Sequence, residues 1–226
     1  MVERGVLMQT RVLVVSAATL LMLSAVSGCD GGVFGVRGSG DVITESRDVS
    51  GFSEIALFGS GKVRIDVNGT ESLIIEAEDN IMPLLTSEVN GGRLELGASS
   101  SISPTTDIIY TISAKALEGV AVSGSGEVTA TGVAADSFDV DISGSGRVEP
   151  TGTAGTLSVE ISGSGRYLGE DLEASAGTVR VSGSGEAVVN VTDDLDVDVS
   201  GSGGVQYIGD PRITESVTGS GDISRK

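Results

Sequence analysis

The tripeptide Gly-Ser-Gly occurs eight times in this chain and sets a nearly regular period. Six of the copies follow one another at intervals of 18 to 20 residues, beginning at Gly124, Gly144, Gly163, Gly183, Gly201 and Gly219. Two earlier copies begin at Gly38 and Gly59, and the 65-residue gap between Gly59 and Gly124 matches about three further units that lack the marker. A short fixed period indicates one small structural unit that is stacked on itself.

Each unit has the pattern of a strand, a glycine corner and a second strand. Apolar and polar residues alternate before the tripeptide, as in 138–142 and 157–161, which is typical of a strand with one buried face. Glycine suits the corner because it adopts positive φ without steric cost. An antiparallel sandwich built from such units would need hairpin turns of about two to five residues and protected edges.

Equivalent positions in successive units carry similar residues, which favours a solenoid over a sandwich. Two residues before each tripeptide the chain has Val122, Ile142, Ile161, Val181, Val199 and Val217. Four residues before it, the chain has Val120, Val140, Val159, Val179, Val197 and then Glu215. Stacked parallel coils would place these residues in columns, and a repeat stack must turn polar in its final unit. We therefore predict an all-β, right-handed parallel β-helix (β-solenoid) with coils of 18 to 21 residues.

The segment 47–117 is less regular than the rest of the chain. Apolar runs such as 62–67 and 73–77 are separated by turn signals, including Asn68-Gly69 and Asn90-Gly91. We expect longer strands in this N-terminal half, which would cap one end of the coil stack. No convincing amphipathic helix follows residue 29.

The N-terminus has the pattern of a bacterial lipoprotein signal. Arg4 and Arg11 precede an apolar run over 12–26, and small residues lead to Cys29, the only cysteine of the chain. The sequence Val26-Ser-Gly-Cys29 resembles a lipobox, in which the cysteine is diacylated and becomes the first mature residue. We expect a signal peptide at 1–28, the lipidated Cys29 with a flexible tether at 29–40, and the solenoid domain at 41–226.

The chain is strongly acidic, with 32 Asp and Glu residues against 14 Lys and Arg residues and a formal net charge of −18. Such a surface repels nucleic acid and anionic lipid, so we expect no nucleic-acid partner. Because there is no second cysteine, the folded part has no internal disulfide and must be stabilised by packing.

Several segments resemble, in order, a family of exported bacterial proteins. They are Arg47–Ile55, Phe58–Val63, Glu76–Asn80, Val89–Leu94 and Leu117–Gly126. The chain is similar over about residues 40–221 to the family described as "putative auto-transporter adhesin, head GIN domain". The resemblance implies a β-solenoid fold and an adhesin-like role, and it supplies no catalytic residues.

Residue content argues against catalysis. The chain has no histidine, which removes Ser-His-Asp and Cys-His nucleophilic sites and the usual zinc ligand sets. Ser113 and Lys115 form a formal Ser-Lys pair, but a polar outer strand edge near a turn explains them better. Asp139 and Asp141, with Asp196 and Asp198, are paired carboxylates on an outward strand face. Glycosidase carboxylates need a cleft, and units this short leave no room for the loops that form one.

Calcium is the remaining metal candidate. Glu76, Glu78, Asp79 and Asn80 supply the oxygen ligands that calcium prefers. Solvation explains them as well, because they continue the alternation of a strand into a turn. We therefore predict no catalytic residue, no cofactor and no specific metal site, with Cys29 as the one modified residue.

The sequence favours a non-enzymatic, lipid-anchored protein of the bacterial cell envelope. Its solenoid faces would present an adhesin-like surface to a protein or glycan ligand. One alternative is a structural or stress-related envelope component without an external ligand, and a third is a polysaccharide lyase or hydrolase built on a β-helix. The ligand, the oligomeric state and the membrane leaflet stay open at this point.

Overall fold

The fold of this chain is almost entirely β-structure, as predicted. The computed structural model describes residues 35–226, which contain one short 3-10 helix, η1 (Met82–Leu84), and no α-helix. The regular part is made of the strands β10 (Gly119–Gly124), β11 (Glu127–Gly144), β12 (Arg147–Gly163), β13 (Arg166–Gly183), β14 (Glu186–Gly201), β15 (Gly204–Ile208), β16 (Arg212–Gly219) and β17 (Asp222–Arg225).

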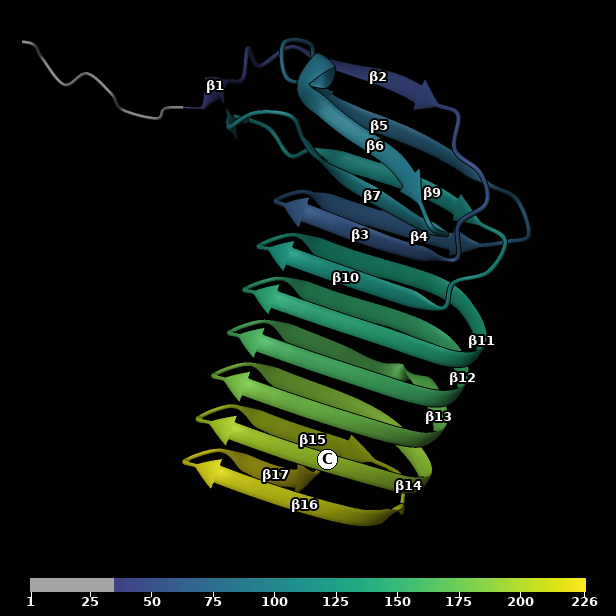
Figure 1. The fold of residues 1–226 in the computed structure, drawn as a ribbon, viewed down its shortest axis with the longest axis vertical. Helices are drawn as coiled ribbons and strands as arrows, with labels where there is room; N and C mark the ends of the chain where they lie inside the picture. Colours follow the sequence, from purple (N-terminus) through teal and green to yellow (C-terminus); the bar gives the residue numbers. More distant parts are fainter. Residues whose placement is uncertain (1–34) are drawn as a thin grey trace, which may run out of the picture. The chain divides into compact units, whose positions relative to one another are not determined.

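The long strands β11–β14 each bend once and contribute to two walls of a coil stack (Figure 1). The front wall contains β10, the C-terminal halves of β11–β14 and β16, all parallel and in register. The back wall contains the N-terminal halves of β11–β14 with β15 and β17. The chain runs along the front wall to the Gly-Ser-Gly corners, returns along the back wall and then enters the next coil below. This path is right-handed, and it confirms the predicted β-solenoid.

The Gly-Ser-Gly corners lie directly over one another and require glycine. Gly144 has φ of 117°, and a Cβ atom there would lie 2.5 Å from the carbonyl oxygen of Gly124 in the neighbouring coil. The next amide, Ser145 N–H, donates to that same oxygen at 2.8 Å. A side chain at the first position of the tripeptide would therefore disrupt the hydrogen bond that joins two corners.

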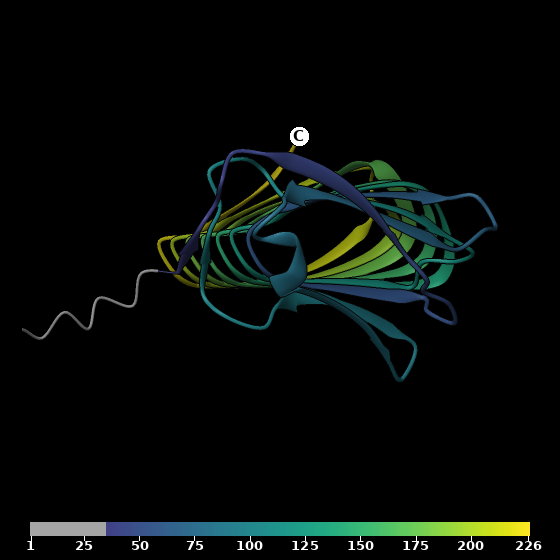
Figure 2. The ribbon, with the colours of Figure 1, turned by 90° about the horizontal axis from the view of Figure 1, so that it is seen from above.

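The inward side chains form one continuous core, and seen from above the coils superpose (Figure 2). Both predicted columns are confirmed by the register, which aligns Val120 with Val140 and Val122 with Ile142. These side chains are at most 2% exposed. Within residues 35–226, the second column is open at the last coil, where Val217 is 45% exposed.

The N-terminal region adds two coils and an antiparallel cap. Its elements are β1 (Val36–Arg37), β2 (Val42–Arg47), β3 (Glu54–Gly59), β4 (Lys62–Val67), β5 (Ser72–Glu78), β6 (Leu85–Asn90), β7 (Arg93–Ala98), β8 (Ile102–Ser103) and β9 (Ile109–Ala114). Strands β7 and β9 run parallel to β3 and β4 and form a coil beside them. Strands β6, β5 and β2 then pair antiparallel beyond that coil, as expected for a cap.

Two expectations for this region are wrong. Gly59 is in direct register with Gly124, so the 65-residue gap does not hold three stacked units. The chain instead leaves the stack after β4, builds the cap and the β7–β9 coil, and returns to pair β10 with β3. The strands from β2 to β9 are also not longer than those of the repeats, since none exceeds seven residues.

Candidate binding face

The outer face of the front wall carries short polar side chains in columns. One column contains Asp139, Ser158, Thr178, Asp196 and Thr214, and the next contains Asp141, Glu160, Arg180, Asp198 and Ser216. The four aspartates named from the sequence are exposed on this face, whereas Val140 and Val197 between them are buried. The structure therefore confirms the outward face. It keeps the two aspartate pairs three coils apart, so the pairs do not combine into one carboxylate site.

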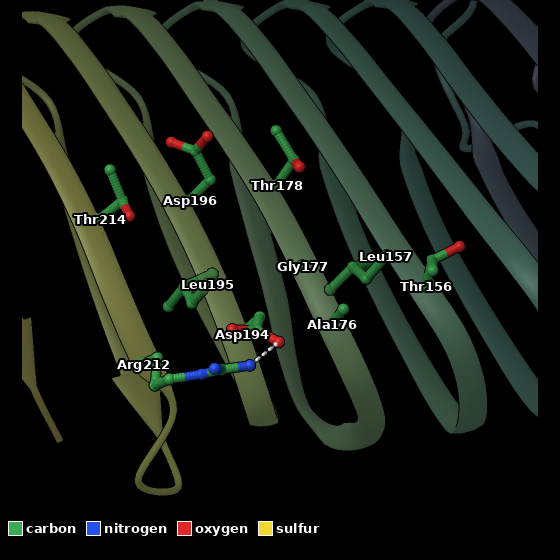
Figure 3. A pocket seen from close by; sticks show the side chains of 10 residues that line it. All are labelled: Thr156, Leu157, Ala176, Gly177, Thr178, Asp194, Leu195, Asp196, Arg212 and Thr214. Atoms are coloured by element: carbon green, nitrogen blue, oxygen red, sulfur yellow. Dashed lines mark hydrogen bonds and ion pairs between the residues drawn. The ribbon is translucent and has the colours of Figure 1, made fainter.

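A shallow hollow of about 280 Å³ lies across the front wall near its bend (Figure 3). Its floor is Gly177, which occupies the inward column between Leu157 and Leu195. Where its neighbours have an isobutyl group, Gly177 has no side chain, and a Cβ atom there would lie 3.0 Å from a methyl group of Val191. The rims are formed by two polar columns, Thr178, Asp196 and Thr214 on one side and Thr156, Ala176, Asp194 and Arg212 on the other.

The hollow combines one cation with carboxylates and hydroxyls. Arg212 donates to Asp194 at 2.8 Å, and the hydrogen bond and charge of Asp194 raise the pKa of Arg212. Both side chains are more than half exposed, so their ion pair contributes little to stability. Their remaining donor and acceptor atoms, together with three threonine hydroxyls, can bind the polar groups of a sugar or a peptide. No nucleophile lies beside a base here.

The sequence analysis did not find this hollow, although a signal was present. In the column Phe138, Leu157, Gly177 and Leu195, the glycine replaces an apolar residue in one coil alone.

The candidate calcium residues have another role. Glu78 is 1% exposed, and its carboxylate accepts hydrogen bonds from Gly40 N–H at 2.8 Å and from the N–H and hydroxyl of Thr105. The hydroxyl of Thr105 is the main cause of a lowered pKa of Glu78, which therefore stays charged. Asp79 and Asn80 bind Ser39 through its hydroxyl and its amide. Within residues 35–226 the structure gathers no set of three side chains suited to a metal ion.

The Gly-Ser-Gly copy at Gly38 therefore belongs to this cluster and not to the corner stack. The formal Ser-Lys pair is also separated, because Lys115 binds Glu71 while the Ser113 hydroxyl accepts from Asn68. The predicted lipidation site Cys29, the signal peptide at 1–28 and the first part of the tether lie outside the described residues. Among the described residues, no helix is long and apolar enough to cross a membrane.

Comparison with known proteins extends the similarity to nearly the whole described region. The model of the family described as "Putative auto-transporter adhesin, head GIN domain" matches residues 51–211. A search of curated proteins finds no match.

Several solved structures share this fold. A putative adhesin from Bacteroides fragilis is 26% identical with a TM-score of 0.66, and the alignment covers 85% of this chain and 100% of that one. A putative adhesin from Parabacteroides distasonis is 20% identical with a TM-score of 0.56, over 84% and 99% of the two chains. A putative lipid binding protein from the same species is 25% identical with a TM-score of 0.51, also over 84% and 99%.

Proposed function

This chain belongs to the family described as "Putative auto-transporter adhesin, head GIN domain", and we propose that it is a lipid-anchored bacterial adhesin that binds through its front wall. The ligand would be a protein or a glycan outside the cell membrane. The proposal includes the signal peptide at 1–28, lipidation of Cys29 and a tether that ends near residue 40. Binding is its proposed role, without catalysis.

The observation that carries the proposed binding site is the hollow over Gly177. A flat sheet offers a partner few places to fix its orientation, whereas a hollow with an arginine, two aspartates and three threonines offers directed hydrogen bonds. The columns on either side are held by backbone hydrogen bonds between coils, so their spacing is rigid. Recognition by such a surface needs little ordering of the protein.

The charge of the face limits the ligand class. Asp139, Asp141, Glu160 and Asp198 surround the region, and Arg180 lies between Glu160 and Asp198 in their column. A neutral or positively charged partner fits this surface, whereas an anionic polysaccharide or nucleic acid is repelled.

The binding site can be tested by filling the hollow. Ala176→Arg would place a long side chain between the rims, and Gln206→Arg is a matched control on the exposed side of the back wall. The exported Cys29→Ser protein, full length after signal removal, would be measured against a panel of purified glycans and extracellular proteins. We expect Ala176→Arg to weaken binding at least about tenfold, a loss near 1.4 kcal/mol, and the control to bind as before.

Two results would contradict the site or the function. Equal binding by both variants would mean that the ligand does not bind at the front wall. If the unmodified face bound nothing on the panel or on whole cells, the role of a structural envelope component would be favoured instead.

The anchor is tested separately by membrane fractionation. Cys29→Ser should move the protein from the membrane fraction to the soluble exported fraction, because the acyl chains need the thiol. Loss of palmitate labelling in the variant is the second measurement. Membrane association that survives the substitution would mean that the protein is not anchored through Cys29.

A further inference from the structure

The two ends of the coil stack expose strands that pair on one side only. At the C-terminal end, within residues 35–226, β16 pairs with β14 alone and β17 with β15 alone. At the other end, β2 pairs with β5 alone. A free strand edge presents unpaired N–H and C=O groups and is a template for another chain. Figure 1 shows β16 and β17 at the bottom of the stack and β2 at its top.

The C-terminal end also exposes apolar surface. Val217 ends the column that contains Val181 and Val199, and it is 45% exposed because no coil covers it. Ile213 and Ile223 are partly buried beside it. A strand edge with apolar residues next to it would be expected to associate with a second copy of the same chain.

One inward position in β16 breaks the pattern. The neighbouring column contains Leu94, Ile55, Val120, Val140, Val159, Val179 and Val197, all at most 2% exposed, and then Glu215. Glu215 lies directly opposite Val197 and points along the same side of the sheet. Among the described residues, no ion pair is formed with its carboxylate.

We propose that Glu215 prevents a second copy of the chain from pairing with this end of the solenoid. Any strand that paired with β16 would cover the Glu215 carboxylate with apolar side chains, and burial of an unpaired charge is strongly unfavourable. A second copy related by a two-fold axis would bring its own Glu215 to the same interface, and the two carboxylates would repel each other. Inward-pointing charges of this kind protect edges in other sheets.

The opposite end also carries a glutamate on the inward side of an edge strand, and there the carboxylate is paired with an arginine. The edge strands β2 and β16 share the tetrapeptide Ile-Thr-Glu-Ser, at 43–46 and 213–216. Glu45 faces Ile75, which is fully buried, so this glutamate is also on the inward side of its strand. It binds Arg47 at 2.8 Å, and Arg47 donates to the carbonyl oxygens of Leu85 and Met82 in the cap. Both ends thus place a carboxylate where an added strand would need an apolar residue.

The test is the oligomeric state of Glu215→Val, measured by size exclusion with light scattering over a wide concentration range. We expect the exported Cys29→Ser protein to keep the mass of one chain. Addition of Glu215→Val should give a mass of two chains or more that rises with concentration. Glu160→Val is the matched control, because it removes the same charge from an exposed outward position in the middle of the stack.

Two further variants keep the result interpretable. Glu215→Lys restores a charge at the edge and should return the protein to a single chain, and Glu215→Ala removes the charge with less apolar surface and should associate more weakly. A single-chain mass for both Glu215→Val and Glu215→Ala would overturn the proposal. A mass of two chains or more for the protein that keeps Glu215, unchanged in Glu215→Lys, would overturn it as well.

Discussion

Tyr167 is a large polar residue in a column of small apolar ones. It lies in register between Val148 and Ala187, and its side chain is fully buried. The coil makes room for it at Gly169, where a Cβ atom would lie 2.5 Å from the phenol oxygen. Among the described residues its hydroxyl has no hydrogen-bond partner, and burial raises the pKa of Tyr167, so the phenol stays neutral.

This hydroxyl should therefore cost stability. A buried polar group without a partner is unfavourable by about 1–3 kcal/mol, and phenylalanine has the same ring without the oxygen. We expect Tyr167→Phe to raise the free energy of unfolding by about 1 kcal/mol, measured by chemical denaturation. Tyr207→Phe, at a partly exposed site, is the control and should change little. A clear loss of stability in Tyr167→Phe would mean that the hydroxyl has a partner.

At the residue level, the sequence predicted which side chains face inward but not what the outward ones do. Alternation is enough to place Val140 in the core and Asp139 outside, because a strand has only two faces. The role of Glu78 could not be predicted in this way. Its hydrogen-bond donors come from Gly40 and Thr105, which are 38 and 27 residues away in the chain.

The elements divide into those that repeat and those that occur once. The coils were predictable because each one pairs with a copy of itself, so that a pattern seen six times fixes both strand and corner. The strand pairing within the cap was not, since its antiparallel strands β2, β5 and β6 have no repeat to reveal their partners. Even the marker is ambiguous, because Gly59 forms a corner while the copy at Gly38 folds around Glu78. The hollow over Gly177 depends on a bend that the alternation alone does not locate.

The cap should make the protein sensitive to acid. The folded pKa of Glu78 lies below its ordinary value of 4.5, mainly because of the Thr105 hydroxyl. A depressed pKa contributes stability above the unfolded value, and that stability is lost as the pH falls through the folded value. We expect Glu78→Gln to lower the Tm at neutral pH, and the difference from wild type to shrink below pH 4.5.

Glu76→Gln is the control for that experiment, because Glu76 is on the same strand, two residues earlier, and is not fully buried. It should leave the dependence of Tm on pH nearly unchanged. A difference between wild type and Glu78→Gln that stays constant from neutral to acidic pH would show that the charge of Glu78 does not stabilise the cap.

For the molecule as a whole, stability should depend on position along the stack. Each inner coil is covered on both sides, whereas the last one is covered on one side only. Ile142 and Val217 occupy the same column, and they are 1% and 45% exposed. The same substitution at these two positions therefore separates the effect of burial from the effect of strand chemistry.

Ile142→Asp should unfold the domain or destabilise it by more than about 4 kcal/mol, because the carboxylate would be buried without a partner. Val217→Asp should cost about 1 kcal/mol or less. Thermal unfolding followed by circular dichroism distinguishes the two. Melts of similar midpoint for both variants would mean that the middle of the stack is no more tightly packed than its end.

The in-register glycine corners have a consequence for how such proteins can change over time. Every corner binds the corner above it in the same way and presents the same surface to the corner below. Duplication of a single unit would therefore insert a coil without disturbing the cap or the last turn. The length of the domain would then grow in steps of about 4.8 Å. Each short duplication in the gene would thus lengthen the domain by one coil.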